Sequence, residues 1–314
     1  MMEKDGYYIT DLSAYLTVWH AVYFCIMIPT IVGNGLIIIS IIKYRKLRSN
    51  MHVLVLNLAV SDLIVGAVLI PVDLFGDFFK VKSDKNYCLA TVALFITSLG
   101  SSCYNLLLIS IERYIAIVYP LRARLMLTKS KMALMIAIGW VLTILDGLLP
   151  IFGLNTFSNS TANASACLST EVWNKGYRVS NDWQLLVALI ANVTLYSIVV
   201  FVAVRKASGK SRIGDAIQGR SRTTKEMYQL ITMVIVLGTF ILCWLPYNVM
   251  IIFVTLWDCE YYQFIKRCPL IPGVLNSGLN WIIYGYRNAD IRTAFKHVIM
   301  CKKTIRNSYH ASVS

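Results

Sequence analysis

Seven apolar segments dominate the chain, and each is about as long as the hydrocarbon core of a membrane is thick. They cover residues 16–42, 51–75, 88–118, 131–153, 183–205, 226–257 and 268–286. A membrane-spanning helix needs about 20 apolar residues, because each residue advances the helix by about 1.5 Å. Hydrophobic residues make up 57% of the chain and charged residues only 15%, unlike a soluble domain. The pattern predicts an all-α membrane protein, a bundle of seven transmembrane helices.

Basic residues are distributed unevenly between the two ends of these segments. Of the 30 Lys and Arg residues, 22 lie on the side that holds the C-terminal tail. The positive-inside rule assigns that side to the cytoplasm. The net charge of +14 therefore reports topology, and nucleic acid is not an expected partner. We expect a multi-pass plasma membrane protein with an extracellular N-terminus (residues 1–15), a transmembrane domain (16–286) and a cytoplasmic amphipathic helix with a tail (287–314).

Polar side chains inside the apolar segments are the candidate functional groups. Asp62 lies near the middle of the second segment, where a carboxylate is costly and by default marks a functional site. The alternative is a neutral carboxyl group that is hydrogen-bonded to Asn34. If the helices form one bundle, hydroxyl and amide oxygens surround Asp62 and offer ligands to a hard cation such as Na⁺. This candidate sodium site consists of Asp62, Ser102, Asn276, Ser277 and Asn280.

Two glycosylation sequons begin at Asn159 and Asn163, in the loop that follows the fourth segment. Both lie on the side assigned to the exterior, where N-glycosylation takes place. A third match, at Asn192, lies inside the fifth segment and is discarded.

Five cysteines lie outside the apolar interior. Cys88 and Cys167 both fall on the exterior side, where a disulfide is possible, and Cys259 with Cys268 offers a second pairing. Cys301 follows the amphipathic stretch at the inner surface. It is either a palmitoylation site or a free cytosolic thiol.

These features together resemble the rhodopsin-like (class A) G protein-coupled receptors. The matching residues are Gly33-Asn34, Leu58 to Asp62, Cys88 with Cys167, Glu112-Arg113-Tyr114, Trp140, Cys243 to Pro246, and Asn280 to Tyr284. They occur in order, each in its own apolar segment. The resemblance implies a receptor that binds an extracellular small molecule within the bundle, activates heterotrimeric G proteins and has no catalytic residues.

The resemblance also implies a conformational switch. Arg113 would pair with Glu112 and with Glu226 in the resting state. An agonist above Trp244 would then let the sixth helix swing about Pro246. The residues assigned to the switch and to G protein coupling are Glu112, Arg113, Tyr114, Leu121, Tyr196, Glu226, Pro246 and Tyr284.

Two departures from the family pattern bear on signalling. Trp281 occupies the position of the motif proline in the seventh segment, and Ala188 that of the usual proline in the fifth. An alternative is therefore a receptor-like protein that binds without signalling. A seven-helix transporter is more remote, because the chain shows no paired internal repeats.

The family's known ligand contacts constrain the ligand mainly by exclusion. Phe95 stands where amine receptors carry aspartate, and Val274 where opsins carry the retinal lysine. Residues 65–71 and 149–155 are similar to adenosine receptors, but Ile251 and Gly273 replace residues that hold adenosine there. We therefore expect an unknown small ligand, no retinal, and a mostly apolar and aromatic pocket. The pocket is predicted to be lined by Phe95, Ile96, Leu99, Trp244, Tyr247, Asn248, Leu270 and Val274.

Asp73 lies outward of Asp62 and has two interpretations. It is either a solvated acid at a helix end or a partner for a cationic ligand. Asp62, Asp73 and Asp146 do not form one obvious path, which argues against an ion channel.

Overall fold

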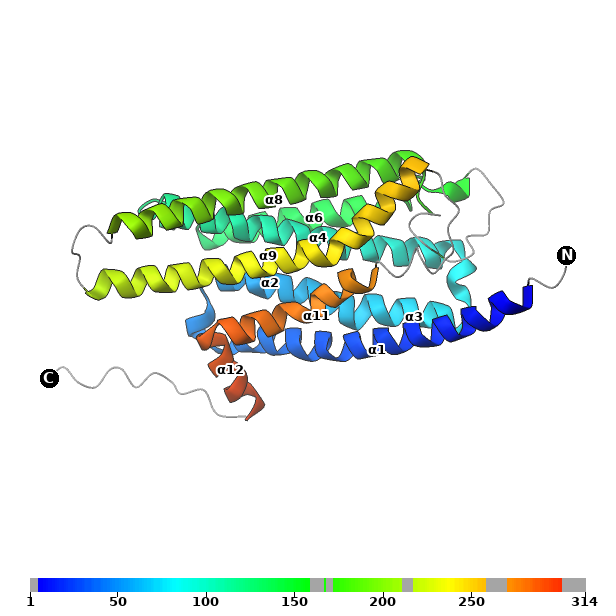
Figure 1. The fold of residues 1–314 in the computed structure, drawn as a ribbon, viewed down its shortest axis with the longest axis horizontal. Helices are drawn as coiled ribbons and strands as arrows, with labels where there is room; N and C mark the ends of the chain where they lie inside the picture. Colours follow the sequence, from blue (N-terminus) through cyan, green and yellow to red (C-terminus); the bar gives the residue numbers. More distant parts are fainter. Residues whose placement is uncertain (1–4, 159–166, 168–171, 211–216, 258–269, 301–314) are drawn as a thin grey trace.

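The computed structural model describes residues 5–158, 167, 172–210, 217–257 and 270–300. Within this part the chain is helical apart from short connections and one isolated β-bridge between Asn155 and Trp173. The long helices run side by side along one axis (Figure 1). In chain order they are α1 (Asp5–Lys43), α2 (Asn50–Ile64) with its continuation α3 (Ile70–Phe78), α4 (Lys85–Val118), α6 (Lys129–Leu148), α8 (Lys175–Lys210), α9 (Ile217–Trp257) and α11 (Leu270–Arg287).

Short elements connect the long helices. One π-helical turn, η2 (Val65–Leu69), joins α2 to α3 without breaking the second segment. The others are η1 (Arg45–Leu47), η3 (Val81–Ser83), α5 (Ala123–Met126), η4 (Thr156–Ser158) and α12 (Ala289–Ile299).

Polar residues at the helix starts explain where several helices begin. The Asp84 carboxylate accepts a hydrogen bond from the Tyr87 backbone N–H at 2.8 Å, at the start of α4. Asn288 accepts from the N–H groups of Asp290 and Ile291 at the start of α12. Such N-caps satisfy N–H groups that have no partner inside the helix. These local sequence signals therefore set the helix boundaries.

The described helices include six stretches that are long and apolar enough to cross a membrane. α11 packs against α1 and α9 and completes the bundle. Its polar residues Asn276, Ser277 and Asn280 are buried, so they face the other helices. The seven-helix bundle predicted from the sequence is thus confirmed, with α11 as the seventh helix.

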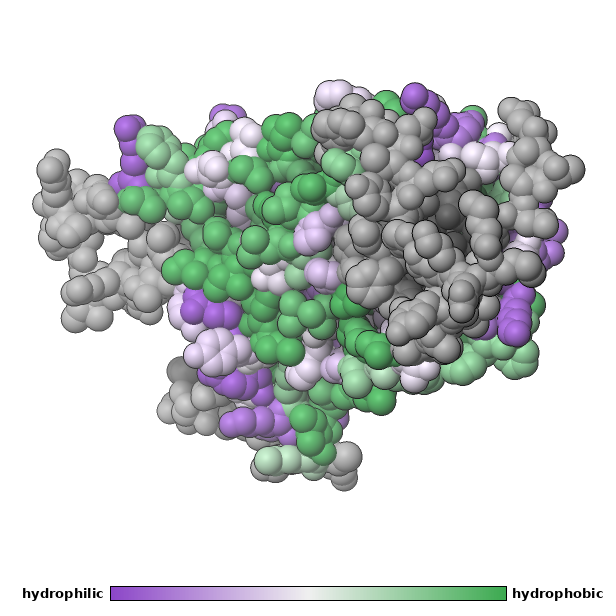
Figure 2. Space-filling view, turned by 45° about the vertical axis from the view of Figure 1, so that its right-hand side comes forward, coloured by the Kyte–Doolittle hydropathy of each residue, from purple (hydrophilic) through white to green (hydrophobic). Residues whose placement is uncertain are grey.

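The outer surface of the bundle is apolar, whereas many of its buried side chains are polar. Exposed large hydrophobic residues occur along the outward faces of α1, α6 and α8. Figure 2 shows apolar side chains over the middle of one face, with hydrophilic ones gathered mainly toward its edges. This arrangement suits a lipid environment, in which apolar groups need no burial and polar groups need partners.

The first and the last described helices, α1 and α12, reach opposite ends of the bundle. The start of α1 and helix α12 lie at opposite ends of the bundle (Figure 1). α12 is amphipathic: Ile291, Ala294 and Phe295 are buried, and Asp290 forms an ion pair with Lys46 at 2.8 Å. The expected short helix after the last segment is therefore present. Cys301 lies outside the described residues.

Candidate functional site: a ligand pocket, a buried polar centre and an inner arginine

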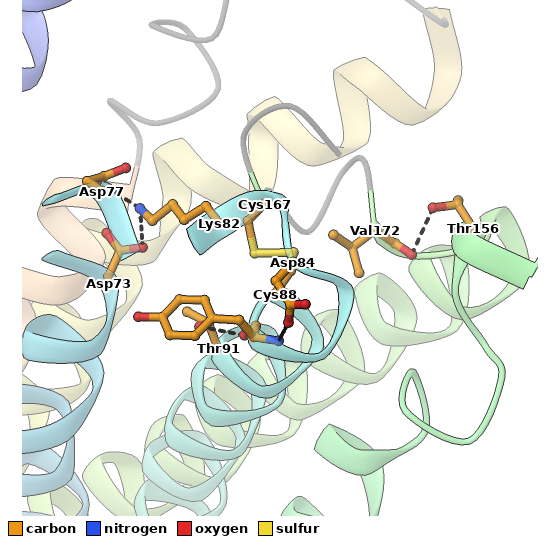
Figure 3. Close-up of a disulfide and its surroundings, with 10 residues drawn as sticks. Asp73, Asp77, Lys82, Asp84, Cys88, Thr91, Thr156, Cys167 and Val172 are labelled. Atoms are coloured by element: carbon orange, nitrogen blue, oxygen red, sulfur yellow. Dashed lines mark hydrogen bonds and ion pairs between the residues drawn. A yellow bond between two sulfur atoms is a disulfide. The ribbon is translucent and has the colours of Figure 1, made fainter. Parts of the chain in front are cut away.

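A disulfide anchors the outer end of α4. Cys88 and Cys167 are bonded, with their Cα atoms 5.4 Å apart (Figure 3). Cys88 is fully buried in an apolar cluster with Val172 and Trp173 of the loop before α8. The bond therefore holds that loop over the outer end of the bundle. The second pair, Cys259 with Cys268, and the sequons at Asn159 and Asn163 lie outside the described residues.

Asn192 is fully buried inside the bundle. Its side chain accepts a hydrogen bond from the Ser110 hydroxyl at 3.1 Å. A side chain in this position cannot receive a glycan, so setting aside the third sequon was correct.

Asp73 is paired with a lysine from the adjacent turn. The Lys82 ammonium lies 2.7 Å from Asp73 and 2.9 Å from Asp77, and Lys82 is only 7% exposed (Figure 3). Nε2 of His20, in α1, lies 3.3 Å from Oδ2 of Asp77. Asp73 is therefore an ion-paired and partly exposed acid, whereas the sequence suggested only solvent or a ligand as its partner. Asp73 already has a cationic partner, which it shares with Asp77.

Three aromatic rings form the centre of the predicted ligand pocket. The centroid of Phe95 lies 6.0 Å from that of Trp244 and 5.8 Å from that of Tyr247, and those two rings meet edge to face at 5.9 Å. Gly273 of α11 allows the close approach of Trp244, since a Cβ there would lie 2.8 Å from the indole. Val274 packs in an adjoining cluster with Leu270 and Phe95 at its edge. Three helices, α4, α9 and α11, thus contribute apolar walls around Trp244.

Two predicted pocket residues have other contacts. Ile96 packs with Cys88 and Trp173 beneath the outer loop. The Asn248 side-chain amide donates a hydrogen bond to the Trp244 carbonyl at 2.8 Å, within the same helix. This bond uses one N–H of the amide and leaves the other N–H and Oδ1, so the role of Asn248 as a hydrogen-bonding group for a ligand stays a prediction.

Asp62 lies at the centre of the bundle and is completely buried. Its Oδ2 atom accepts a hydrogen bond from the Asn280 amide at 2.8 Å. The Asn34 amide instead donates to the carbonyls of Thr30 and Ser277, each at 3.0 Å. The proposed alternative pairing of Asp62 with Asn34 was therefore wrong, and the partner comes from α11.

Several buried oxygens around Asp62 make no hydrogen bond within the described part of the chain. They are Oδ1 of Asn34, Asp62, Asn276 and Asn280. Ser102 is close by, with its hydroxyl 3.5 Å from that of Ser61. Oxygens without donors are the groups that a hard cation or a water molecule would satisfy. The residues present therefore fit the predicted Na⁺ site.

A small cavity links this polar centre to the ligand pocket. It has a volume of about 20 Å³, enough for about one water molecule. Trp244 and Phe95 line its outer part, and Ser102, Asn276 and Ser277 its inner part. A shift of the Trp244 indole would therefore change the surroundings of the polar centre directly.

An asparagine network that was not foreseen joins α2, α4 and α6. The Trp140 indole N–H donates to Asn57 at 2.9 Å, and the Asn57 amide donates to Asn105 at 2.9 Å. The Asn105 amide in turn donates to the Leu54 carbonyl at 3.0 Å. Trp140 stood out in the sequence, but Asn57 and Asn105 did not. The only sequence signal for Asn105 was the presence of a polar amide within an apolar segment.

Arg113 lies near the inner end of α4 and forms an ion pair with Glu112. Its guanidinium makes two hydrogen bonds to the neighbouring Glu112 carboxylate, 2.5 Å from Nε and 2.7 Å from Nη2. Such bidentate pairs are among the stronger charged interactions in proteins. The side chain of Glu226 lies outside the described residues, so the expected contact across to α9 stays a prediction.

Two tyrosines assigned to the switch point into the bundle. Tyr196 and Tyr284 are both buried in the main apolar cluster, which also contains Phe240 and Trp244. Tyr114 instead stacks edge to face against Tyr119, with 6.1 Å between the centroids.

Leu121 lies on the inner surface and is 93% exposed. Its predicted role as a docking contact for the G protein stays a prediction.

Pro246 lies inside α9. It cannot donate a hydrogen bond to the Leu242 carbonyl one turn earlier, which weakens the helix there. α9 changes direction along its length (Figure 1).

Trp281 packs directly on Gly33 of α1. A Cβ added at Gly33 would overlap the indole ring. α11 has no proline at this point and continues as an unbroken helix from Leu270 to Arg287. Where the family's proline would interrupt the helix, the Trp281 side chain instead makes a close contact between α11 and α1.

Comparison with known proteins identifies relatives along most of the chain. The model of the 7 transmembrane receptor (rhodopsin family) matches residues 33–284. The histamine H2 receptor of Cavia porcellus is 26% identical over 308 residues, which are 96% of this chain and 85% of that receptor. Lysophosphatidic acid receptor 3 of Homo sapiens is 31% identical over 283 residues, 89% of this chain and 77% of the receptor. The D(5)-like dopamine receptor of Takifugu rubripes is 29% identical over 315 residues, which are 90% of this chain and 67% of that receptor.

Proposed function

Because the chain belongs to the rhodopsin family of seven-transmembrane receptors, we propose that Trp244 is the element through which its ligand acts. The chain is a G protein-coupled receptor that binds a small molecule and has no enzymatic role of its own. The observation that carries the proposal is the position of Trp244. Its indole contacts the aromatic pocket on one side and lines the cavity that reaches Asn276 and Ser277 on the other.

The ligand would act by favouring one position of α9. Binding shifts an equilibrium only if the ligand has different affinities for the two states. Trp244 moves with α9, whereas Phe95 and Val274 belong to α4 and α11. The affinity of a ligand bound between these residues therefore depends on the distance of α9 from α4 and α11. In the active state the inner end of α9 would move away from Arg113, and Tyr196 and Tyr284 would line a cleft for the G protein.

The ligand itself is proposed to be a small, largely apolar molecule. The relatives are named for histamine, lysophosphatidic acid and dopamine, so the family accommodates both amines and lipids. In this chain Phe95 occupies the usual position of the amine-binding aspartate, and Asp73 is paired with Lys82. The pocket around Trp244 therefore has no evident carboxylate for an ammonium group. The likeness to adenosine receptors stays a prediction.

Na⁺ is proposed as a ligand of the polar centre. Asp62, Ser102, Asn276, Ser277 and Asn280 would hold it, because their buried oxygens outnumber the donors around them. The ion would neutralise a carboxylate that is otherwise costly inside the bundle. It would be expected to favour the compact, inactive arrangement.

The receptor is proposed to lie in the plasma membrane with its N-terminus outside. The excess of Lys and Arg in the segments on the α12 side supports this orientation. The same basic segments would contact anionic membrane lipids and the G protein. Nucleic acid is not proposed as a partner.

The test is G protein activation in cells that express the chain at their surface. Agonist-independent activity and responses to a ligand panel would be read as cAMP and as Gα recruitment. We expect a signal that Arg113→Ala abolishes, whereas Arg178→Ala, at the outer end of α8, retains it. Normal surface expression with no response to any ligand would contradict the proposal and favour a non-signalling binding protein.

A further inference from the structure

A second and larger cavity lies on the side of the bundle, between α4, α6 and α8. Its volume is about 230 Å³, whereas the cavity beneath Trp244 measures about 20 Å³. Leu99, Cys103, Leu142, Leu185 and Ala188 form most of its apolar wall. Ile96 and Leu99 of the predicted pocket line it, but Trp244 and Tyr247 do not, so it lies beside the centre of that pocket.

The cavity reaches from the protein core to the surface that faces lipid. Leu99 and Cys103 are buried at its floor, whereas Leu142 at its rim is 54% exposed. Ala188 supplies a small side chain where the family usually has a proline, which leaves room between the helices. A molecule dissolved in the bilayer could enter sideways, without passing the outer loops.

One end of this cavity is polar. Asp146 of α6 lines it together with Asn181 and Gln184 of α8. The Asn181 amide lies 3.4 Å from Oδ2 of Asp146, which is a weak hydrogen bond. Among the described residues, no Lys, Arg or His comes within 4.0 Å of this carboxylate to form an ion pair. A carboxylate within a membrane-spanning helix is costly without such a partner.

We propose that this side cavity binds a cationic amphiphile from the membrane. The ammonium group would lie against Asp146, with Asn181 and Gln184 offering further polar contacts. The first part of the chain would pack on Leu99, Cys103 and Leu185. The volume is below the roughly 300–1,000 Å³ of enclosed ligand sites, so the rest of the chain would extend past Leu142 into lipid. This site does not depend on the proposed function of the Trp244 pocket.

The charge of the ligand is the decisive part of the proposal. An apolar cavity alone would accept any lipid chain, whereas Asp146 selects for a positive head group. Two probes separate these cases, namely photoreactive octylamine and photoreactive octanol, each with a diazirine on the chain. They share the same chain, and the amine is protonated at neutral pH as a lysine side chain is.

The experiment uses the full-length receptor in phosphatidylcholine nanodiscs, with labelled peptides mapped by mass spectrometry. We expect octylamine to label α4, α6 and α8 around the cavity. Asp146→Asn should lower this labelling about tenfold, because it removes a charge-assisted contact. Asp182→Asn, which changes a carboxylate of α8 that does not line the cavity, should leave the labelling unchanged. Octanol should label weakly and respond to neither change.

A second variant covers the case in which Asp146→Asn fails to fold. Ala188→Leu keeps the carboxylate but fills the space, and it should reduce labelling by both probes. The proposal is overturned if octanol labels as strongly as octylamine, or if octylamine labels other helices. It is equally overturned if folded Asp146→Asn and Ala188→Leu receptors label like the wild type.

Discussion

Asp62 and Asp146 both lie in helices that cross the membrane, yet the bundle surrounds their carboxyl groups in different ways. Asp62 is completely buried and accepts a hydrogen bond from Asn280 at 2.8 Å, with further amide and hydroxyl groups around it. Asp146 is partly exposed on the side of the bundle, and the Asn181 amide lies 3.4 Å away. One carboxyl group is enclosed by protein, whereas the other lines a cavity beside the lipid.

Asp73 shows a third arrangement, in which it shares a buried lysine with Asp77. The comparison teaches that an acidic residue in a membrane helix has no single meaning. A carboxyl group held by its neighbours belongs to the receptor's own structure, and one without a strong partner is open to a ligand. The following predictions test this distinction.

The largest effect is expected from Lys82→Met. Asp73 and Asp77 would lose their cation in a largely buried site, and breaking such a pair costs roughly 3 kcal/mol of unfolding free energy. Thermal unfolding of the purified receptor would measure the loss. Lys80→Met is the matched control, because Lys80 is exposed in the same turn and forms no ion pair among the described residues. Equal stability of the two variants would show that the lysine does not compensate these carboxylates.

Gly33→Ala should lower the stability of the receptor near the polar centre, although the substitution does not change Asp62 itself. The added Cβ would overlap the Trp281 indole and push on α11, which carries Asn280. Overpacking of this kind costs about 1–3 kcal/mol. Gly35→Ala provides the control, since a Cβ there has no neighbour within 4 Å. If both alanine variants unfold at the same temperature as the wild type, the close packing of Trp281 is not important for stability.

Sodium should stabilise the receptor through Asp62 and not through Asp146. Replacing choline chloride by NaCl would add about 1.4 kcal/mol at a sodium concentration tenfold above Kd, because only the folded protein binds the ion. Asp62→Asn should abolish the difference in unfolding temperature between the two salts. Asp146→Asn should preserve it, and a loss of the sodium effect in that variant would contradict the assignment of the site.

The smallest effect is expected for Asp146→Asn in the absence of any amphiphile. This carboxylate is partly exposed and its partners are the neutral amides of Asn181 and Gln184, so the unfolding free energy should change by no more than about 0.5 kcal/mol. Thermal unfolding in nanodiscs would measure it beside Asp182→Asn. A loss of several kcal/mol would show that Asp146 is a structural residue like Asp62.

Local patterns were sufficient to predict much of the fold. The apolar segments predicted the helices, because in lipid each helix satisfies its own backbone hydrogen bonds. Asp84 and Asn288 mark helix starts through contacts that span only three residues. The motif from Glu112 to Tyr114 resembled a family that the comparisons then confirmed.

Pairings between distant segments were harder to predict. The sequence left Asp62 with Asn34 as a candidate partner, but the helix arrangement gave it Asn280. No local pattern singled out Lys82, which the fold of that turn places between two carboxylates. The bond from the Asn248 amide to a carbonyl of its own helix was likewise not predicted.

The sequence by itself determined the membrane-spanning helices, their topology signals and the family. These depend on composition and on contacts between near neighbours in the chain. Only the tertiary structure decided that Trp281 rests on Gly33 and that Asp146 faces a side cavity instead of the core. The physical reason is that the rotation and packing of each helix depend on side chains far away in the sequence. Those same contacts decide which buried charge is satisfied and which remains available.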